Sequence, residues 1–473
     1  MHRRSPFLGL LALSALALAA TSARAVETKA FVFTSDFSTG MISVVNLNTR
    51  AVTPDVASVG SDAALRWYNG LLYVVNRFGG DNIQVVDPAQ NYATVRQIST
   101  GNGSNPQDIA FFSPKKAYVS RYGSADLLVM NPSTPNGQPM STISLAAFAD
   151  ADGLPEMAHM IRVGRYLFIA CQRLTNFAAS NPSVVVVIDM PADTVVDVDP
   201  GVPGKQAIAL TGRNPVTTFA FDRTNSRLLL GEVGDYFALD GGIEAIDPVT
   251  FHSLGMVTTE AILGGDLADV EWVSPTHSYA VVSGSSTQLV SWNPTTGARI
   301  ATVLDASGGF GVPDVELDDR GELYACRNTS TPSEPPGMMV YGTPGDALLA
   351  GPLGTGLPPI AVTFDQATDS VTAVPEVAIA SASDLRLGPG SPNPTASIAR
   401  FTLEGARAAQ ARVEIFDFAG RRVRELPTQL SGAREEITWD LADEAGRPVH
   451  DGIYFVRAKV DRRISVRRVV VLR

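Results

Sequence analysis

Three aspartates at the same place in three short apolar segments are the first candidates for chemistry. Asp108 stands in PQDIAFF, Asp269 in ADVEWV and Asp314 in PDVELD, and the equivalent places in two further segments hold Met157 and Thr217. If these segments are strands around one axis, the three carboxylates converge at its mouth. Converging carboxylate oxygens are the ligands that a hard divalent cation such as calcium prefers. The pattern therefore predicts a cation site at the three aspartates.

A second set of polar residues lies two positions further along the same segments: His159, Glu271 and Glu316. Because side chains alternate along a strand, both sets point to the same side. Three interpretations stay open for them: a cation site, a site that hydrogen-bonds a polar ligand, or a water-filled channel with ordinary polar walls. His159 beside carboxylates suits a general base, and it also suits an ordinary channel residue.

A third set combines arginines with aromatic residues in the loops that follow the next strands. Arg77-Phe78 and Arg121-Tyr122 are adjacent pairs, and the rest of the set is Arg173, Phe177, Glu232, Tyr236, Phe237 and Arg327. Arginine beside an aromatic ring suits an anionic or flat ligand, held by paired hydrogen bonds and by stacking. The alternative is that each arginine pairs with an acidic neighbour in the next repeat and holds the repeats together.

Other signals for chemistry are weaker. Asp150-Ala151-Asp152-Gly153 has the opening of a calcium loop, but the remaining ligands do not follow, so a plain connection is expected. The sequence contains no G-x-S-x-G, H-E-x-x-H, Walker A or G-x-G-x-x-G motif. Cys171 and Cys326 occupy matching places in different repeats, far apart in a ring, which predicts two buried free thiols.

These residues belong to a repeated unit, seen best in LLYVVNRFGGDNIQVVDP from Leu71 to Pro88. Two apolar, β-branched strands flank a turn that contains glycine. The signature recurs seven times at roughly 40 to 60 residues, a spacing typical of four-stranded propeller blades, starting at Val44, Val85, Val129, Val187, Ala245, Ser291 and Val340. A spare strand, PIAVTFD from Pro359 to Asp365, would complete the first copy and close the ring.

The repeat resembles the YVTN-type repeat of YncE-like seven-bladed β-propellers, in which YVTN, a short loop and V-x-V-I-D follow one another. The copies at Ser291 and Val340 depart from this pattern. The resemblance implies a propeller over residues 26–371, in which ligands bind at the top face around the central channel. The family mixes binding proteins, enzymes and surface proteins, so the resemblance implies a fold more than a function.

The N-terminus has the features of a secretory leader. Arg3 and Arg4 form a basic region, Phe7 to Ala20 an apolar region, and Ala23-Arg24-Ala25 a cleavage site. We therefore expect residues 1–25 to be a signal peptide. The apolar run is too short to span a membrane comfortably, and no later segment is apolar enough.

Residues 372–392 are rich in Ser, Ala, Pro and Gly and are predicted to be a linker. Residues 393–473 then contain new short alternating strands, which suggests an Ig-like β-sandwich. The overall prediction is an all-β chain, with a seven-bladed β-propeller followed by a small sandwich.

This tail resembles the FlgD-like and type IX secretion (Por) C-terminal sorting domains. The matching pieces, in order, are Pro392-Asn393-Pro394, Asp417-Phe418-Ala419-Gly420-Arg421, Trp439-Asp440, Gly446, Gly452-Ile453-Tyr454-Phe455 and Arg468-Val469-Val470-Val471-Leu472. The resemblance implies handling by outer-membrane secretion machinery, with a destination at the cell surface or outside the cell.

Charge is divided unevenly between the parts of the chain. From Leu385 onward 16 Lys and Arg stand against 11 Asp and Glu, and the leader adds three arginines. The whole chain carries −11, so Val26 to Asp384 carries −19. A body that acidic is a poor partner for nucleic acid and suits an exported protein that attracts cations.

Together these features predict an exported, surface-associated propeller that binds a small molecule or a partner protein on its top face. Some YncE-like relatives capture small molecules such as corrinoids, which makes small-molecule capture a specific form of this hypothesis. One alternative is a lactonase-type hydrolase that uses His159 with Glu271, Glu316 and arginines, by analogy with related propeller folds. A structural envelope protein is another, and whether the chain is an enzyme stays open.

Overall fold

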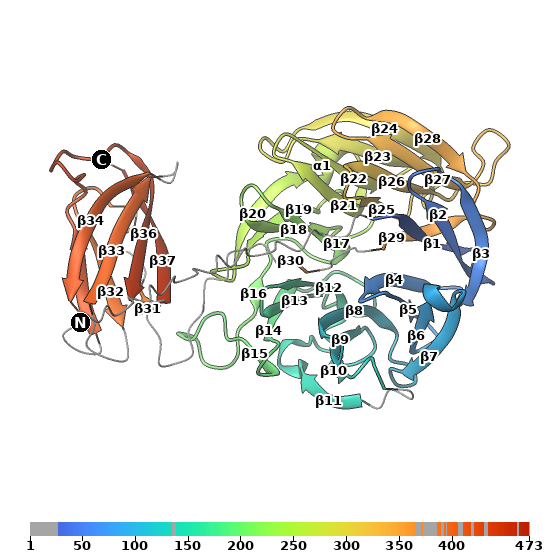
Figure 1. Cartoon of the computed structure of the whole chain (residues 1–473), viewed down its shortest axis with the longest axis horizontal. Helices are drawn as coiled ribbons and strands as arrows, with labels where there is room; N and C mark the ends of the chain where they lie inside the picture. Colours follow the sequence, from blue (N-terminus) through green and yellow to red (C-terminus); the bar gives the residue numbers. More distant parts are fainter. Residues whose placement is uncertain are drawn as a thin grey trace, which may run out of the picture.

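The computed structural model describes residues 27–134, 139–365, 370–371, 386–388, 392–393, 395–404, 410–417, 421–429, 434–460 and 463–472. The expected signal peptide and most of the expected linker lie outside these residues. The described chain is almost entirely β-strand, in a large ring of sheets and a separate small sandwich (Figure 1). This confirms the predicted fold class.

Seven sheets form the ring, and each has four strands in antiparallel order from the channel outward. We number these blades along the chain. Blades 1 to 3 comprise β29 (Pro359–Phe364), β1 (Lys29–Ser35), β2 (Gly40–Asn46) and β3 (Val52–Val59); β4 (Ala63–Tyr68), β5 (Leu71–Asn76), β6 (Asn82–Asp87) and β7 (Ala93–Ser99); and β8 (Pro106–Ser113), β9 (Lys116–Arg121), β10 (Asp126–Met130) and β11 (Pro139–Ser144).

The other blades follow the same order, with small additions. Blade 4 also contains the two-residue strands β16 (Ile208–Ala209) and β30 (Ser370–Val371), and helix α1 (Glu260–Leu263) precedes blade 6. Blades 4 to 7 comprise β12 (Met157–Val163), β13 (Tyr166–Cys171), β14 (Val184–Asp189) and β15 (Thr194–Val195); β17 (Pro215–Asp222), β18 (Arg227–Glu232), β19 (Gly242–Asp247) and β20 (His252–Thr259); β21 (Asp266–Ser274), β22 (His277–Ser283), β23 (Ser286–Trp292) and β24 (Arg299–Ser307); and β25 (Val315–Leu317), β26 (Glu322–Arg327), β27 (Gly337–Gly342) and β28 (Ala347–Leu353).

The spare strand closes the ring as predicted. β29 pairs antiparallel with β1, with Phe364 opposite Ala30 and Val362 opposite Val32. The last strand of the propeller thus becomes the innermost strand of the first blade. Closure pairs the edge that β1 would otherwise expose, which removes a site for aggregation.

The core of the ring is divided among the seven contacts between neighbouring blades. Side chains alternate across each strand, so Leu72 and Val74 pack toward blade 1 while Tyr73 and Val75 pack toward blade 3. Each contact contains one cluster of buried apolar residues. This is why the middle strands are apolar on both faces. Both cysteines are buried and free, as predicted, Cys171 between blades 3 and 4 and Cys326 between blades 7 and 1.

After closing the ring, the chain makes one more contact inside it. β30 pairs parallel with the inner strand of blade 4, with Ser370 beside Arg162 and Val371 beside Val163. Figure 1 shows β30 within the ring. These residues of β12 are at the opposite end of the strand from Met157, where the loop from blade 3 enters. The chain therefore leaves the propeller at the lower end of the inner strands.

The tail forms two antiparallel sheets around its own core. One sheet contains β31 (Arg386–Leu387), β32 (Ala399–Glu404) and β35 (Arg434–Trp439), and the other contains β34 (Arg422–Gln429), β33 (Gln410–Asp417), β36 (Gly452–Val460) and β37 (Arg463–Val471). Trp439, fully buried, packs edge-on against Tyr454 with ring centroids 5.2 Å apart. The alternating pattern predicted for ARVEIFDF is present, because Val413 and Ile415 both lie in this core.

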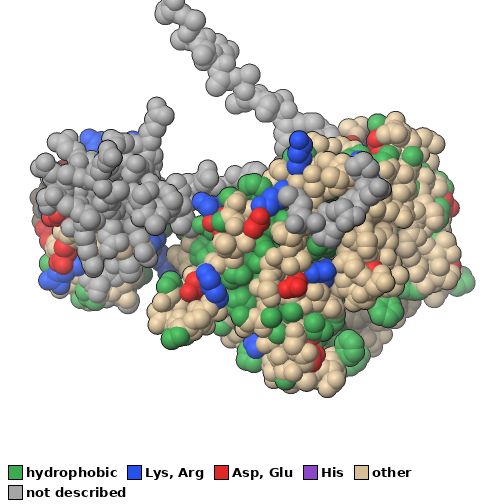
Figure 2. Space-filling model, turned by 90° about the horizontal axis from the view of Figure 1, so that it is seen from below, with side chains coloured by type: hydrophobic (Ala, Val, Ile, Leu, Met, Phe, Trp, Pro, Cys, Tyr) green, Lys and Arg blue, Asp and Glu red, His purple; other side chains and the backbone are tan. Residues whose placement is uncertain are grey.

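Several charged side chains on the face drawn in Figure 2 lie next to one of opposite sign, among scattered exposed hydrophobic residues. The described residues include no helix with the length and hydropathy needed to cross a membrane.

Because β29 closes the ring, we expect truncation of its Phe364 side chain to destabilise the propeller strongly. This side chain is 2% exposed and meets Tyr324 of blade 7 edge-on at 5.2 Å. We expect Phe364→Ala to lower the free energy of unfolding of the propeller by about 3–5 kcal/mol, because it leaves a cavity between blades 7 and 1. Denaturant unfolding measures this. Leu349→Ala, on outer strand β28 and 51% exposed, is the control and should change stability by no more than about 0.5 kcal/mol. Equal effects of the two substitutions would show that the closing strand contributes little.

Candidate functional site

The three aspartates predicted as a cation site share one structural role. Asp108 accepts a hydrogen bond from Met160 N (2.8 Å), Asp269 from Val315 N (3.1 Å) and Asp314 from Val362 N (2.7 Å). In each case the donor lies on the inner strand of the next blade. Each inner strand is the channel-side edge of its blade, so the N–H groups that point away from the second strand have no ladder partner at this level, and an aspartate of the preceding blade accepts from them. We call these three contacts the aspartate latches.

The latch of blade 3 is charge-compensated and lies apart from the other two. Asp108 is 1% exposed and forms a two-pronged ion pair with Arg66 of β4, with Arg66 Nε 3.0 Å from Oδ1 and Nη2 3.0 Å from Oδ2. His159 Nδ1 lies 3.9 Å from Asp108 Oδ2 and has no hydrogen-bond partner among the described residues. Burial lowers the pKa of His159 to about 4, against the opposing effect of Asp108. The imidazole is therefore neutral near pH 7.

Asp269 and Asp314, by contrast, are brought together on blades 6 and 7. Their carboxyl groups hydrogen-bond each other, and Thr218 Oγ1 also donates to Asp269 at 3.1 Å. Burial raises the pKa of Asp269 to about 6, and burial followed by the charge of Asp269 raises that of Asp314 well above its usual value. The same two causes raise the pKa of Glu271 to about 8. For Glu316, burial and then Glu271 raise the pKa well above its usual value. This side of the channel is a crowded group of carboxyls.

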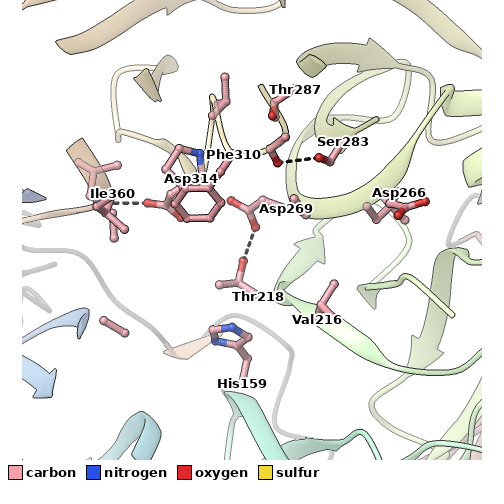
Figure 3. A pocket seen from close by; sticks show the side chains of 18 of the residues that line it. His159, Val216, Thr218, Asp266, Asp269, Ser283, Thr287, Phe310, Asp314 and Ile360 are labelled. Carbon is pink, nitrogen blue, oxygen red and sulfur yellow. Dashed lines mark hydrogen bonds between the residues drawn. The ribbon is translucent and has the colours of Figure 1, made fainter. Parts of the chain in front are cut away.

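Asp269, Asp314 and Glu316 of this group line a cavity of about 590 Å³ at the upper end of the channel. Its walls come from the starts of inner strands in six of the seven blades, with blade 3 absent. His159 of β12 enters from one side, while Asp269 of β21 and Asp314 enter from the far side (Figure 3). Glu316 also lines the cavity. Asp108 and Glu271 do not line it. The cation prediction at the three aspartates stays a prediction, and the structure joins two of them in one group.

Sequence reasoning missed three residues of this cavity: Arg66, Asp266 and Phe310. Arg66 stands two positions after Ala64 on an inner strand, so the alternation that singled out His159 also applied to it. Asp266 starts β21 and is 3% exposed, with Phe237 N donating to its Oδ2 at 2.7 Å. Phe310 lies in the loop between blades 6 and 7, which has no repeated signature. Its position depends on the loop's conformation.

The arginines of the predicted Arg-aromatic ring are engaged within their own loops. Arg77 binds Asp62, with Nη2 2.6 Å from Oδ1, and is the one member of the four that lines the cavity. Arg121 donates to the carbonyls of Asp126 and Thr100, Arg173 to that of Pro182 and Arg327 to that of Pro335. Backbone carbonyls, rather than acidic neighbours, thus take most of these guanidiniums. Anion binding there stays an untested prediction.

The aromatic residues around the cavity form what we call the aromatic crown: Phe37, Phe78, Phe177, Tyr236, Phe237 and Phe310, each between 51% and 85% exposed. Five lie in loops between the second and third strands of a blade, at the end where inner strands begin. Phe37, Phe177 and Phe237 have φ of 66°, 65° and 68°. A left-handed backbone costs a bulky residue of the order of 1–3 kcal/mol. Tyr122, next to Arg121, is only partly exposed and does not join the crown.

Two other acidic groups differ from expectation. Glu232 is fully buried at the end of β18, and burial followed by Glu244 raises its pKa to about 10. It therefore does not face a top-face ligand. Asp150 and Asp152 of the apparent calcium loop come within 4.8 Å of Glu156, a geometry that could hold a metal ion. However, Thr175 Oγ1 and Asn181 Nδ2 donate to Asp150, and Leu174 N donates to Glu156. We assign no ion to this group.

Comparison with known proteins identifies the tail and the fold. Residues 391–472 match the family described as the secretion system C-terminal sorting domain. A search of curated proteins gave no match.

Solved structures resemble the propeller alone. A protein from Bacteroides uniformis, described as a candidate 6-phosphogluconolactonase, aligns with a TM-score of 0.51 at 14% identity, over 72% of this chain and 99% of its own. A protein of the same description from Bacteroides fragilis gives 0.50 at 12% identity, with the same coverage. A Lactobacillus plantarum protein with no stated function gives 0.50 at 13% identity, again with the same coverage. At such identities the likeness concerns the fold. The chain thus carries a sorting domain behind a propeller, and the sorting domain indicates export.

The latch of blade 3 predicts that Asp108→Asn destabilises the propeller by about 3 kcal/mol, because it leaves Arg66 buried without its counter-charge. Asp235→Asn, in an exposed pair with Arg213, is the control and should cost less than about 1 kcal/mol. Thermal unfolding should give the same difference with and without added calcium. A stabilisation by calcium that disappears in Asp108→Asn would instead support the predicted cation site.

The cluster of four carboxyls in the channel predicts that the stability of the propeller depends on pH. Replacing Glu271 with Gln should remove part of this dependence. Because the pKa of Glu271 is raised on folding, its contribution to stability is complete below pH 4.5 and is lost as the pH rises through about 8. We therefore expect Glu271→Gln to raise the melting temperature of the propeller at pH 8 and to leave it nearly unchanged at pH 5. Asp305→Asn, on the exposed side of β24, should do neither. An equal effect of Glu271→Gln at both pH values would contradict the assignment.

Proposed function

We propose that this protein captures a small molecule in the cavity at the upper end of its propeller, while the C-terminal sorting domain brings it to the cell surface. The observation that carries the proposal is the cavity. At about 590 Å³ it falls in the range of small-molecule sites, and it combines apolar walls with a few polar groups that converge on it.

Two further features support ligand entrance from the top. The aromatic crown provides exposed apolar surface around the mouth of the cavity, held in part by strained backbone. Exposed apolar side chains concentrated at one face of a protein suggest a binding surface. In addition, the chain leaves the propeller by way of β30, which pairs at the lower end of β12. Attachment through the tail would therefore leave the top face accessible.

The sorting domain supports the other half of the proposal. A secretion-system sorting domain at residues 391–472 implies recognition by secretion machinery, and surface placement is the usual destination of such cargo. A protein displayed there meets solutes from outside the cell. A binding role suits this position, with a partner protein as the alternative ligand.

The lactonase alternative receives less support from the geometry. His159 is neutral and, with a pKa of about 4, a weak base near pH 7, where a general base works best with a pKa near 7. The hydroxyls of Ser283 and Thr287 donate to the carbonyls of Gly309 and Gly308, so neither is paired with a base. The resemblance to candidate lactonases concerns the fold.

Filling the cavity tests the proposal. Val216 projects into it from β17, and Val216→Trp would occupy a large part of its volume (Figure 3). Native mass spectrometry of the mature chain, purified from its own culture, should detect a bound small molecule in the natural protein and lose it in Val216→Trp. Ala93→Trp, on the exposed side of outer strand β7, is the control and should retain it. A natural protein free of any bound molecule, with no response to a small-molecule panel in thermal-shift assays, would point to a partner protein or a structural role.

A further inference from the structure

The charges that line the cavity divide into compensated cations and uncompensated acids. Arg66 is held by both oxygens of Asp108, and Arg77 by Asp62. His159 is neutral, as described above. The cations at the wall are thus already matched by carboxylates that do not line it. A ligand entering the cavity meets no free positive charge from these three residues.

The acids on the opposite wall form no ion pair among the described residues, although the charge of Arg66 counters part of the rise in the pKa of Asp314 and of Glu316. Glu316 is half-buried and lines the cavity, while Asp266, 3% exposed, leaves its Oδ1 without a hydrogen-bond partner among the described residues. The hydrogen-bonded Asp269–Asp314 pair lines the same wall. A buried carboxylate oxygen without a donor is costly, and native proteins normally supply a partner. The partner missing from this carboxylate oxygen is a hydrogen-bond donor. A donor that carries positive charge would suit the carboxyls of this wall best.

The rim of the cavity adds a second, independent feature. Phe310, Tyr236 and Phe237 all line the cavity and are 51%, 61% and 85% exposed. Phe310 contacts Phe37 of blade 1, with ring centroids 5.8 Å apart, so the rim continues across two blades. Aromatic faces attract both organic cations and flat apolar groups. A simple metal ion would use the carboxylates and leave the rings without a role.

We propose that the ligand of this cavity is an organic cation, with an ammonium or guanidinium group held by Glu316 and Asp266 and an apolar or aromatic frame packed against Phe310, Tyr236 and Phe237. This inference rests on the small-molecule function proposed above and gives it a chemical class. It argues against anionic substrates such as phosphorylated sugar lactones, because an anion would face four carboxyl groups and would find Arg66 and Arg77 already paired. The source of the cation is either a free amine or a basic side chain on a peptide.

Three probes with the same eight-carbon frame and a cationic, neutral or anionic head group test the class: phenethylamine, phenethyl alcohol and phenylacetate, titrated into the mature full-length protein by calorimetry. We expect phenethylamine to bind at least about tenfold more tightly than the alcohol, and phenylacetate not to bind, because an added charged hydrogen bond is worth about that much. Val216→Trp should abolish binding of the amine. Preference for phenylacetate, or equal binding of all three, overturns the proposal.

Two variants locate the charge and the frame. Glu316→Gln preserves shape and should weaken phenethylamine about tenfold while leaving phenethyl alcohol unchanged, whereas Phe310→Ala, at an exposed rim, should weaken both. Asp305→Asn is the matched control and should change neither. Circular dichroism checks that each variant folds. Loss of amine binding in Asp305→Asn equal to that in Glu316→Gln overturns the assignment, because the effect would then be one of overall charge.

Further experiments distinguish a free amine from a basic side chain on a peptide. They also distinguish failure of the organic-cation proposal from failure of the small-molecule capture function. Calcium that displaces phenethylamine from the natural protein, at concentrations where sodium does not, overturns the organic cation in favour of a metal. An arginine-containing tripeptide that binds more tightly than phenethylamine supports the cation and assigns it to a peptide. A co-purified neutral or anionic molecule, lost in Val216→Trp, overturns this proposal while the capture function stands. No bound molecule and no probe binding overturn both.

Discussion

Every blade of this propeller must bury both of its faces, and the rest of the structure depends on that requirement. A four-stranded sheet with apolar residues on both sides cannot be stable alone, so each blade needs a neighbour on each side. In a row of blades the first and last would each expose a face. The ring supplies the missing neighbour, and β29 joins the two ends of the propeller by hydrogen bonds as well as packing. Each fully buried Val or Leu contributes roughly 1.5–3 kcal/mol at these contacts.

The same ring creates the cavity. Inner strands that converge on an axis cannot fill it with backbone, so their side chains and irregularities decide what lies there. The aspartate latches satisfy N–H groups on the channel-side edges of the inner strands, which couples blade 3 to 4, blade 6 to 7 and blade 7 to 1. The latches therefore place carboxylates at the channel for a structural reason. One of them is balanced by Arg66, and the other two stand together with Glu271 and Glu316.

The two ends of the channel are not equivalent. The upper end has a polar wall on one side and an aromatic rim above it, and the chain leaves at the lower end. Under the proposed function the two parts have complementary roles, with the sorting domain for export and the upper cavity for binding. The strained phenylalanines support the same interpretation, because exposed rings on a costly backbone contribute little to folding. The residues that stabilise the ring and those proposed to bind are thus different members of the same loops and strands.

Much of this architecture could be read from the sequence, because the repeat and the tail depend on local patterns. LLYVVNRFGGDNIQVVDP contains two strands and their turn, and its repetition, with the spare PIAVTFD strand, determined a closed ring. Alternation placed Asp108 and His159 on the channel side. The partners of the arginines could not be predicted in this way. The spacing of Arg121 and Arg173 along the chain does not show that nearby backbone carbonyls accept their hydrogen bonds.

What the sequence by itself determined is therefore the set of strands and the side of each strand that faces the channel. Only the tertiary structure decided which residues meet across it: that Asp108 pairs with Arg66, that Asp269 meets Asp314, and that Phe310 reaches the cavity from an unpatterned loop. The physical reason is that strand pattern is a property of neighbours along the chain. Charge compensation and the shape of a cavity depend instead on groups from different blades, whose separation no local pattern contains.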